Sequence, residues 1–226
     1  MSLPTVLFAV LALSGVVMFA LHFLFASTST DAVKIYPKRP RRLPLGRFLR
    51  NMVPNTIFSG ALAVGVTLGL QRWLVDDSGV DVTAFDVAAD VLGALLLYDF
   101  LYYAMHRFVF HEWKAMRSVH AVHHTNKFPT AFESLYMHPL ENFMGLGLLM
   151  VCTAIVGPVS LPAFAIIFAV YSLLNLVIHS GLDFDRPGLR FCGMMARKHA
   201  RHHASMRAGN YASITPLPDI LFDTYE

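Results

Sequence analysis

The sequence predicts an all-α integral membrane protein with four to five transmembrane or hairpin helices and a histidine-rich helical cap on the cytoplasmic side. Three observations support this fold class: an apolar composition, five long apolar runs, and histidines that gather outside those runs. Hydrophobic residues make up 55% of the chain and charged residues 15%, whereas about a quarter of the residues in soluble domains are charged. We therefore expect lipid to surround much of the chain.

The apolar runs differ in how clearly they predict a membrane span. Residues 3–26 would reach about 36 Å as a helix, enough to cross a hydrocarbon core of ~30 Å. A signal peptide is the alternative, but the run is too long and no basic residue precedes it. Further spans are expected at residues 56–74 and 85–105. Residues 143–157 and 162–178 are shorter runs, so they predict either two spans or one tilted hairpin.

The linker between the first two spans, residues 27–55, is strongly basic, with seven Lys or Arg and one acid, Asp31. Short basic loops stay in the cytoplasm, and this one could also bind anionic lipid head groups, whereas nucleic-acid binding is disfavoured between two spans. With the linker in the cytoplasm, 17 of the 18 Lys and Arg lie on that side, and Arg72 is the exception. The sequence thus predicts a multi-pass protein of a bacterial cytoplasmic membrane, with a cytoplasmic C-terminus.

Two histidine triplets share the spacing H-x-x-H-H: His120, His123 and His124, and then His199, His202 and His203. In a helix, residues i, i+3 and i+4 share a face, so the members of each triplet can point together. His106 and His111 are five residues apart, about 140° around a regular helix at about 100° per residue. They can share one site only if the helix bends there; otherwise they address different metals.

The number of histidines predicts two metal ions. Imidazole is the commonest metal ligand in proteins and suits iron, zinc, copper and nickel. One metal rarely takes more than about four to six ligands, and structural zinc takes about four. The chain has ten candidate ligands on the expected cytoplasmic side: His106, His111, His120, His123, His124, His138, His179, His199, His202 and His203. The absence of H-E-x-x-H disfavours a zinc protease, and two cysteines are too few for an iron–sulfur cluster.

Two carboxylates, Asp99 and Glu141, are candidates for orienting the ligands. Asp99 lies about two helical turns before His106, inside an apolar run, where an acid is costly and usually functional or paired. It could accept a hydrogen bond from a ligand imidazole, or it could pair with a neighbouring Arg or Tyr. His138 is either a ligand or an interfacial histidine paired with Glu141.

A series of short strings carries a family resemblance. In chain order they are H-x4-H, H-x2-H-H, HPLE, HSG-x-DF, a second H-x2-H-H and GNYAS, starting at His106, His120, His138, His179, His199 and Gly209. Over residues 95–226 their combination resembles the fatty acid hydroxylase superfamily, the membrane di-iron enzymes that include sterol desaturases and sterol 4-methyl oxidases. Fatty-acid 2-hydroxylases tend to have another histidine four residues before His179, whereas Asn175 stands there and could ligate weakly or hold a water. HPLE and HSG look more like the sterol 4-methyl oxidase branch.

The resemblance implies two non-haem irons that use O2 to hydroxylate or desaturate an unactivated C–H bond of a fatty acyl, sterol or related lipid. The lipid is expected to reach the metals from the bilayer. We expect a single membrane domain over residues 1–226. Within it, residues 1–55 form an N-terminal anchor span and the basic linker, and residues 56–226 form the catalytic domain.

Electrons are expected from a partner such as a ferredoxin, a cytochrome or a reductase, because the sequence has no GxGxxG and no P-loop. Arg197, Lys198 and Arg201 predict either a docking face for an acidic donor or an ordinary solvated helix face. Two other classes stay open: a histidine-rich metal transporter or sensor, and a structural membrane protein with a zinc-stapled cap. A transporter needs polar groups along a path at mid-bilayer, for which only Asp90 and Asp99 are candidates.

Overall fold

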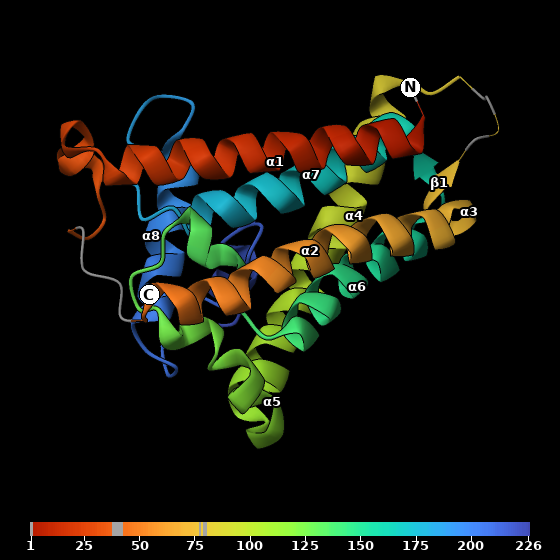
Figure 1. Cartoon of the computed structure of the whole chain (residues 1–226). Helices are drawn as coiled ribbons and strands as arrows, with labels where there is room; N and C mark the ends of the chain where they lie inside the picture. The colour runs from red at the N-terminus through yellow and green to blue at the C-terminus, as the bar shows by residue number, and fades with distance from the viewer. Residues whose placement is uncertain (1, 38–42, 77, 79–80) are drawn as a thin grey trace.

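The chain folds almost entirely into helices, as seen in the computed structural model (Figure 1), which describes residues 2–37, 43–76, 78 and 81–226. The α-helices are α1 (Leu3–Ala26), α2 (Leu45–Gly69), α3 (Gln71–Leu74), α4 (Ala84–Ala104), α5 (Lys114–His120), α6 (Pro139–Val156), α7 (Leu161–Ile178), α8 (Arg190–Ala204) and α9 (Leu217–Leu221). The other helical segments and the strands are η1 (Thr28–Val33), η2 (Met105–Glu112), η3 (His123–Thr125), η4 (Ala131–Leu135), β1 (Val75–Asp76) and β2 (Val159–Ser160). The basic residues of the linker that lie outside the described part are Lys38, Arg39, Arg41 and Arg42.

Within the described residues, four helices are long and apolar enough to cross a membrane: α1, α2, α6 and α7. The predicted class, an all-α multi-pass membrane protein with a histidine-rich helical region, is therefore confirmed. The third span predicted at residues 85–105 forms α4, which packs against α6 and α7 but is not one of these four. It carries three carboxylates, those of Asp86, Asp90 and Asp99.

The second span starts earlier than its apolar run. We expected it over residues 56–74, whereas α2 begins at Leu45 and α3 is a separate short helix. Polar contacts hold the added turns, and a hydropathy profile does not detect such contacts. The side-chain amides of Asn51 and Asn55 both donate to the carbonyl of Met137. Part of the expected linker is thus helical and packed against the segment that precedes α6.

The two shorter apolar runs form two helices of equal length. α6 begins at Pro139, ahead of its apolar run, so α6 and α7 each have 18 residues and reach about 27 Å. Gly157, with a φ of 128°, ends α6 in a backbone conformation that favours glycine. Just beyond it, β1 and β2 pair in parallel through Val75 and Val159, which ties the α6–α7 connection to the end of α3.

The histidine-bearing elements gather at one end of the helical bundle. α1 packs along α7 and α2 along α6, and the core between them is apolar, with Leu7, Leu149 and Phe164 fully buried. In Figure 1, β1, α3 and the start of α1 lie at one end, whereas α8, the C-terminus and the end of α1 lie at the other. The bundle therefore brings histidines from distant parts of the chain to the same end.

Candidate metal centre

A π-helix brings His106 and His111 to the same side of the chain. The chain continues from α4 into η2, whose hydrogen bonds have π-helical spacing. Because these bonds join residues five apart, such residues lie about one turn apart on the same side of the helix instead of about 140° apart. Both imidazoles are buried, and their ring centroids are 5.0 Å apart. This is the bend on which a shared site was predicted to depend.

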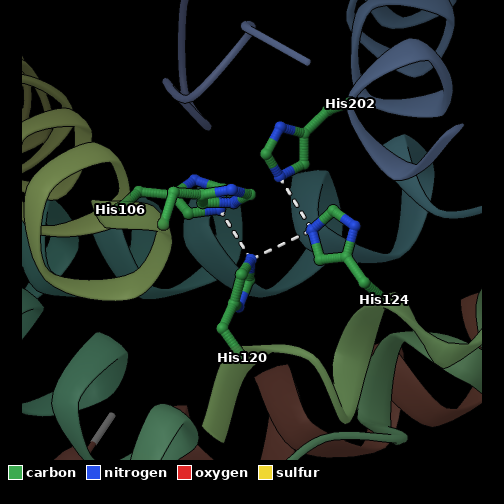
Figure 2. Close-up of side chains that lie close together, drawn as sticks. His106, His120, His124 and His202 are labelled. Atoms are coloured by element: carbon green, nitrogen blue, oxygen red, sulfur yellow. Dashed lines mark hydrogen bonds between the residues drawn. The ribbon is translucent and has the colours of Figure 1, made fainter. Parts of the chain in front are cut away.

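Nine of the ten predicted ligands converge into two groups. The five-histidine group consists of His106, His111, His120, His124 and His202. The four-histidine group consists of His123, His179, His199 and His203. Within each group, the possible ligand atoms all lie within 4.8 Å of one another, and every side chain is buried. Figure 2 shows four members of the first group, whose ring nitrogens point toward a common space.

Each triplet supplies both groups, which corrects the prediction that its three members point together. In the first triplet, His123 joins the four-histidine group while His124 joins the five-histidine group. On α8, His202 and His203 likewise go to different groups. Consecutive helical residues project about 100° apart, so a single helix can address two sites. The two groups are adjacent, because the rings of His124 and His203 stack with centroids 4.7 Å apart.

Backbone carbonyls hold the Nδ1 atoms of six of these histidines. The pairs are His106 with Tyr211 (2.7 Å), His111 with Met206 (3.0 Å), His123 with Tyr136 (3.4 Å), His179 with Asn175 (2.7 Å), His202 with Gly209 (2.8 Å) and His203 with Asn126 (3.2 Å). A carbonyl oxygen only accepts, so Nδ1 carries the proton in each pair. In a neutral imidazole, Nε2 is then left with a free lone pair.

The Nε2 atoms face one another in a way that calls for a cation. Nε2 of His106 lies 3.0 Å from Nε2 of His120, and Nε2 of His123 lies 3.0 Å from Nε2 of His179. His106, His123 and His179 donate through Nδ1 to backbone carbonyls, whereas Nδ1 of His120 lies 2.9 Å from the carboxylate of Glu141 without the geometry of a hydrogen bond. The contact between His123 and His179 therefore brings two lone pairs together with no proton between them. A bound metal ion would turn such a pair into two ligands.

Burial sets the protonation state that metal binding requires. Removal from water lowers the pKa of His111 and His179 to about 4, and the pKa of His120 and His123 to about 3. These imidazoles are neutral near pH 7, which is the form that binds metals. Nε2 of His111 is buried and has no hydrogen-bond partner among the described residues, so it too offers a lone pair. The residues present fit a pair of metal ions.

Asp99 does not contact a ligand imidazole, contrary to the prediction. Its buried carboxylate accepts the backbone N–H groups of residues 213–215 at 2.8–3.1 Å, together with the hydroxyl of Thr215. These residues follow Tyr211, whose carbonyl holds His106. Asp99 therefore acts on the site only by fixing the backbone of this C-terminal segment.

A buried ion pair between Lys198 and Asp219 supports the same segment, and the sequence analysis missed it. The Lys198 ammonium lies 2.7 Å from the Asp219 carboxylate, which also accepts the N–H groups of Tyr211 (2.7 Å) and Ala212 (2.9 Å). Lys198 is 2% exposed, so it cannot belong to the docking face predicted on α8. No spacing in the sequence links these two residues, because irregular chain separates α8 from α9.

The other three predicted residues lie around the groups without joining them. Glu141 pairs with His120 instead of with His138. His138 is exposed and outside both groups, and it caps α6, because its Nδ1 accepts a backbone N–H of the first helical turn at 3.1 Å. Asn175 holds His179 through its backbone carbonyl, and the residue also borders a cavity.

Comparison with known proteins places the chain in a family. The family model for fatty acid hydroxylase matches residues 91–224, which is more than half of the chain and includes both histidine groups. The chain belongs to the fatty acid hydroxylase family. The resemblance predicted from the ordered histidine strings is thereby confirmed.

Curated relatives in plants are about 30% identical to this family member over the aligned residues. A very-long-chain aldehyde decarbonylase of Oryza sativa subsp. indica, GL1-8, is 32% identical over 164 residues, which covers 70% of this chain and 56% of the relative. Its counterpart GL1-10 of Oryza sativa subsp. japonica is 31% identical, covering 62% of this chain and 47% of the relative. Methylsterol monooxygenase 2-2 of Arabidopsis thaliana is 30% identical, covering 62% and 53%. The chain thus spans about half the length of these relatives, and no solved structure matches it.

In this fatty acid hydroxylase family member, a cavity of about 340 Å³ adjoins both histidine groups. The histidines that line it are His106, His120, His123, His179 and His199. Tyr98, Tyr102 and Tyr171 also line it, and Leu146 and Phe168 add apolar surface. The volume falls within the range of about 300–1,000 Å³ that small-molecule sites occupy. A molecule in this cavity would touch ligands of both groups.

Proposed function

We propose that this chain is a membrane-bound non-haem di-iron oxygenase that uses O2 to hydroxylate or desaturate a C–H bond of a lipid. The observation that carries the proposal is the pair of adjacent histidine groups beside a cavity between apolar helices. The family match and relatives named methylsterol monooxygenase and very-long-chain aldehyde decarbonylase support an oxidative reaction on a lipid.

We propose nine iron ligands, with the five-histidine group around one ion and the four-histidine group around the other. His138 leaves the predicted set, because it lies outside both groups. When bound, the irons would supply the activation of O2 and the oxidation of an unactivated C–H bond. The chain keeps the imidazoles neutral by burial and orients them through backbone carbonyls and Glu141. Burial also keeps bulk water away from the reacting carbon.

Iron fits these groups better than a structural zinc does. The five-histidine group already exceeds the four ligands that structural zinc takes. Around tetrahedral zinc, bonds of about 2.0–2.1 Å place ligand atoms about 3.3–3.4 Å apart. The close Nε2 pairs in both groups are 2.9–3.1 Å apart, which favours more ligands around each ion. The zinc-stapled alternative is therefore disfavoured.

A metal transporter is disfavoured because both carboxylates that could line a path bind backbone groups. The carboxylate of Asp99 accepts the N–H groups of residues 213–215, and that of Asp90 accepts the N–H of Ser160 at 3.3 Å. Carboxylates that are held in this way serve the fold, whereas ions moving through a bilayer need polar groups that can exchange partners.

We further propose that the histidine groups and the C-terminus face the cytoplasm, and that the whole chain works as one membrane domain. The positive-inside rule supports this orientation, since Arg72, the one basic residue assigned to the outer side, lies in α3 at the end opposite α8 (Figure 1). The relatives above are plant proteins and do not support a bacterial membrane as the source.

An external electron donor is part of the proposal, because reduction of O2 consumes electrons that the histidine groups do not store. A ferredoxin, a cytochrome or a reductase could supply them. Arg197 and Arg201 are both exposed on α8, although Arg197 is paired with Asp183. These two arginines, without Lys198, are the proposed contact for an acidic donor.

Oxygen-dependent lipid analysis combined with metal analysis tests the proposed function. Membranes that contain the wild-type protein should yield, in air but not under argon, a lipid that has gained oxygen or lost hydrogen. His123→Ala should abolish this product and lower the iron content, because it removes one of the four-histidine group.

His138→Asn is the matched control. Asparagine is a good helix cap, so this variant should keep the fold, the iron and the product. Full activity of His123→Ala with full iron would contradict the ligand assignment, and a zinc-loaded protein without any oxygen-dependent product would favour the structural staple.

A further inference from the structure

Two helices outside the family match form one wall of the cavity. The match begins at residue 91, whereas α1 and α2 both end before that residue. The cavity-lining residues of these helices are Leu11, Ser14, Gly15 and Met18 on α1, and Thr56, Ser59, Gly60 and Ala63 on α2. The sequence analysis treated α1 as an anchor span, but its position makes it part of the proposed substrate site.

These residues define a slot about 10 Å long. On each helix they span seven helical steps of about 1.5 Å, from Leu11 to Met18 and from Thr56 to Ala63. α1 runs toward the histidine end of the bundle and α2 runs away from it (Figure 1). Met18 and Thr56 therefore lie nearer the histidine groups, and Leu11 and Ala63 form the far end of the slot.

Gly15 and Gly60 keep the middle of the slot open. A Cβ atom added at either position would have no other heavy atom within 4 Å. In contrast, a Cβ atom added at Gly145 on α6 would lie 3.6 Å from the hydroxyl of Tyr171, so that wall is closely packed. Glycine is unfavourable inside a helix, and here it leaves space where a side chain would project into the cavity.

A single layer of helix separates the slot from the surrounding lipid. Phe8 and Phe19 are 61% and 52% exposed on α1, and Ile57 is 68% exposed on α2. Large apolar side chains that are exposed on membrane-spanning helices face the hydrocarbon. A lipid chain in the bilayer thus lies beside the two helices that enclose the slot.

We infer that α1 and α2 select the substrate, that Gly15 and Gly60 are the residues that determine specificity, and that the slot takes one aliphatic chain of a lipid. The cavity of about 340 Å³ lies near the lower end of the range for small-molecule sites, about 300–1,000 Å³, which favours a slender chain over a fused-ring sterol. The inference rests on the proposed function in so far as a lipid occupies the cavity, but not on which oxidation follows.

Binding of cis-parinaric acid, a fluorescent single-chain fatty acid, tests the inference on the full-length protein in detergent without turnover. Octanoate and palmitate serve as a short and a long competitor. In Gly15→Leu and Gly60→Leu the new side chain fills the slot. The affinity for palmitate, measured by displacement of cis-parinaric acid, should therefore fall at least about tenfold relative to the affinity for octanoate.

Gly65→Leu is the matched control, and its competition ratio should equal that of the wild type. Gly65 also lies on α2 and also has no heavy atom within 4 Å of an added Cβ, but it does not line the cavity. Iron content and melting temperature are measured on the same samples. If a leucine variant does not fold, Gly15→Ala and Gly60→Ala are used in its place. They should shift the ratio of palmitate to octanoate affinity in the same direction by a smaller factor.

An unchanged ratio in folded variants at Gly15 and Gly60 overturns the inference. So does a wild-type protein from which dehydroergosterol, a fluorescent sterol, displaces parinaric acid better than palmitate does. If the variants change the competition ratio as expected but the wild-type protein oxidises no lipid, the oxygenase proposal is refuted and the slot assignment stands.

Discussion

Backbone carbonyls orient most of the imidazoles in this site, and a carboxylate orients only one of them. His106 and His202, for example, donate to the carbonyls of Tyr211 and Gly209. A carbonyl fixes the tautomer of an imidazole without adding a negative charge to the site. His120 is the exception, because its Nδ1 lies 2.9 Å from a carboxylate, that of Glu141. The charge of that single carboxylate should therefore have a measurable effect on metal binding.

We predict that Glu141→Gln weakens metal binding without unfolding the chain. The amide keeps a polar group of the same size beside His120, but the negative charge that strengthens this imidazole as a ligand is lost. Metal affinity should fall by about 10- to 100-fold in an iron titration of the metal-free protein. Glu112→Gln changes a largely exposed carboxylate paired with Arg107, so its affinity should match the wild type. Equal effects of the two changes would contradict the role of Glu141.

At the level of residues, spacing predicted which histidines come together but not how they divide between two groups. His123 and His124 are neighbours in the sequence, yet they serve different groups, because the rotation of the backbone at each position is not encoded in spacing. His138 stands in a string typical of the family, but its ring turns back to cap α6. Asp99 was recognised as a buried acid, whereas its partners lie over a hundred residues away in the chain.

Among the elements, the segment between α8 and α9 supports the site from its C-terminal side. Asp99 and Asp219 hold the backbone N–H groups of residues 211–215, and three carbonyls of the segment, those of Met206, Gly209 and Tyr211, hold imidazoles. At Gly209 an added Cβ would collide with the carbonyl of Thr224, so only glycine fits this close approach. A well-ordered backbone in this segment therefore fixes the orientation of the imidazoles that it holds.

Asp219→Asn should lower both the stability of the chain and its iron content. The change leaves the Lys198 ammonium buried without its counter-charge, and breaking a buried ion pair costs about 3–5 kcal/mol. Thermal unfolding and metal analysis measure the two effects. The double variant Lys198→Met/Asp219→Asn removes both charges and should regain part of the lost stability. No recovery would show that the two residues are not energetically coupled.

Hydropathy predicted the helices but not their ends, because polar contacts set several of these ends. α2 gains its first turns through Asn51 and Asn55, and α6 gains its first turn through His138 and Pro139. The π-helix leaves no mark in apolar periodicity either. Only the five-residue spacing of two histidines hinted at it, and that spacing left a bend and two separate sites equally open.

For the whole molecule, the positions of the basic residues and of the histidines are independent features, and both support the proposal that the same end of the bundle faces the cytoplasm. We predict that in sealed right-side-out vesicles Ser118→Cys is protected from an impermeant maleimide and Val82→Cys is labelled, with Cys152 and Cys192 replaced by serine. Ser118 is exposed on α5 at the histidine end, and Val82 is exposed before α4 at the other end. Permeabilisation should expose Ser118→Cys. Its labelling in intact vesicles would refute the proposed orientation.

Removal of metal should destabilise the whole histidine end. The proposed ligands lie on η2, α5, η3, the end of α7 and α8, so bound ions would link segments that are far apart in the chain. A ligand that binds only the native state stabilises it by mass action. Prolonged dialysis against a chelator should lower the melting temperature, and added ferrous iron should restore it. A melting temperature that is insensitive to the chelator would argue against a metal held by these residues.

The helix α8 gives His202 to one group and both His199 and His203 to the other. The first ion to bind would immobilise this helix, so the second ion would bind with a smaller loss of conformational entropy. Loading should then be cooperative, and native mass spectrometry of partly loaded protein should find copies with no ion and copies with two, and few with one. Under iron shortage, a membrane would hold a few fully loaded molecules and many empty ones instead of many molecules with a single ion.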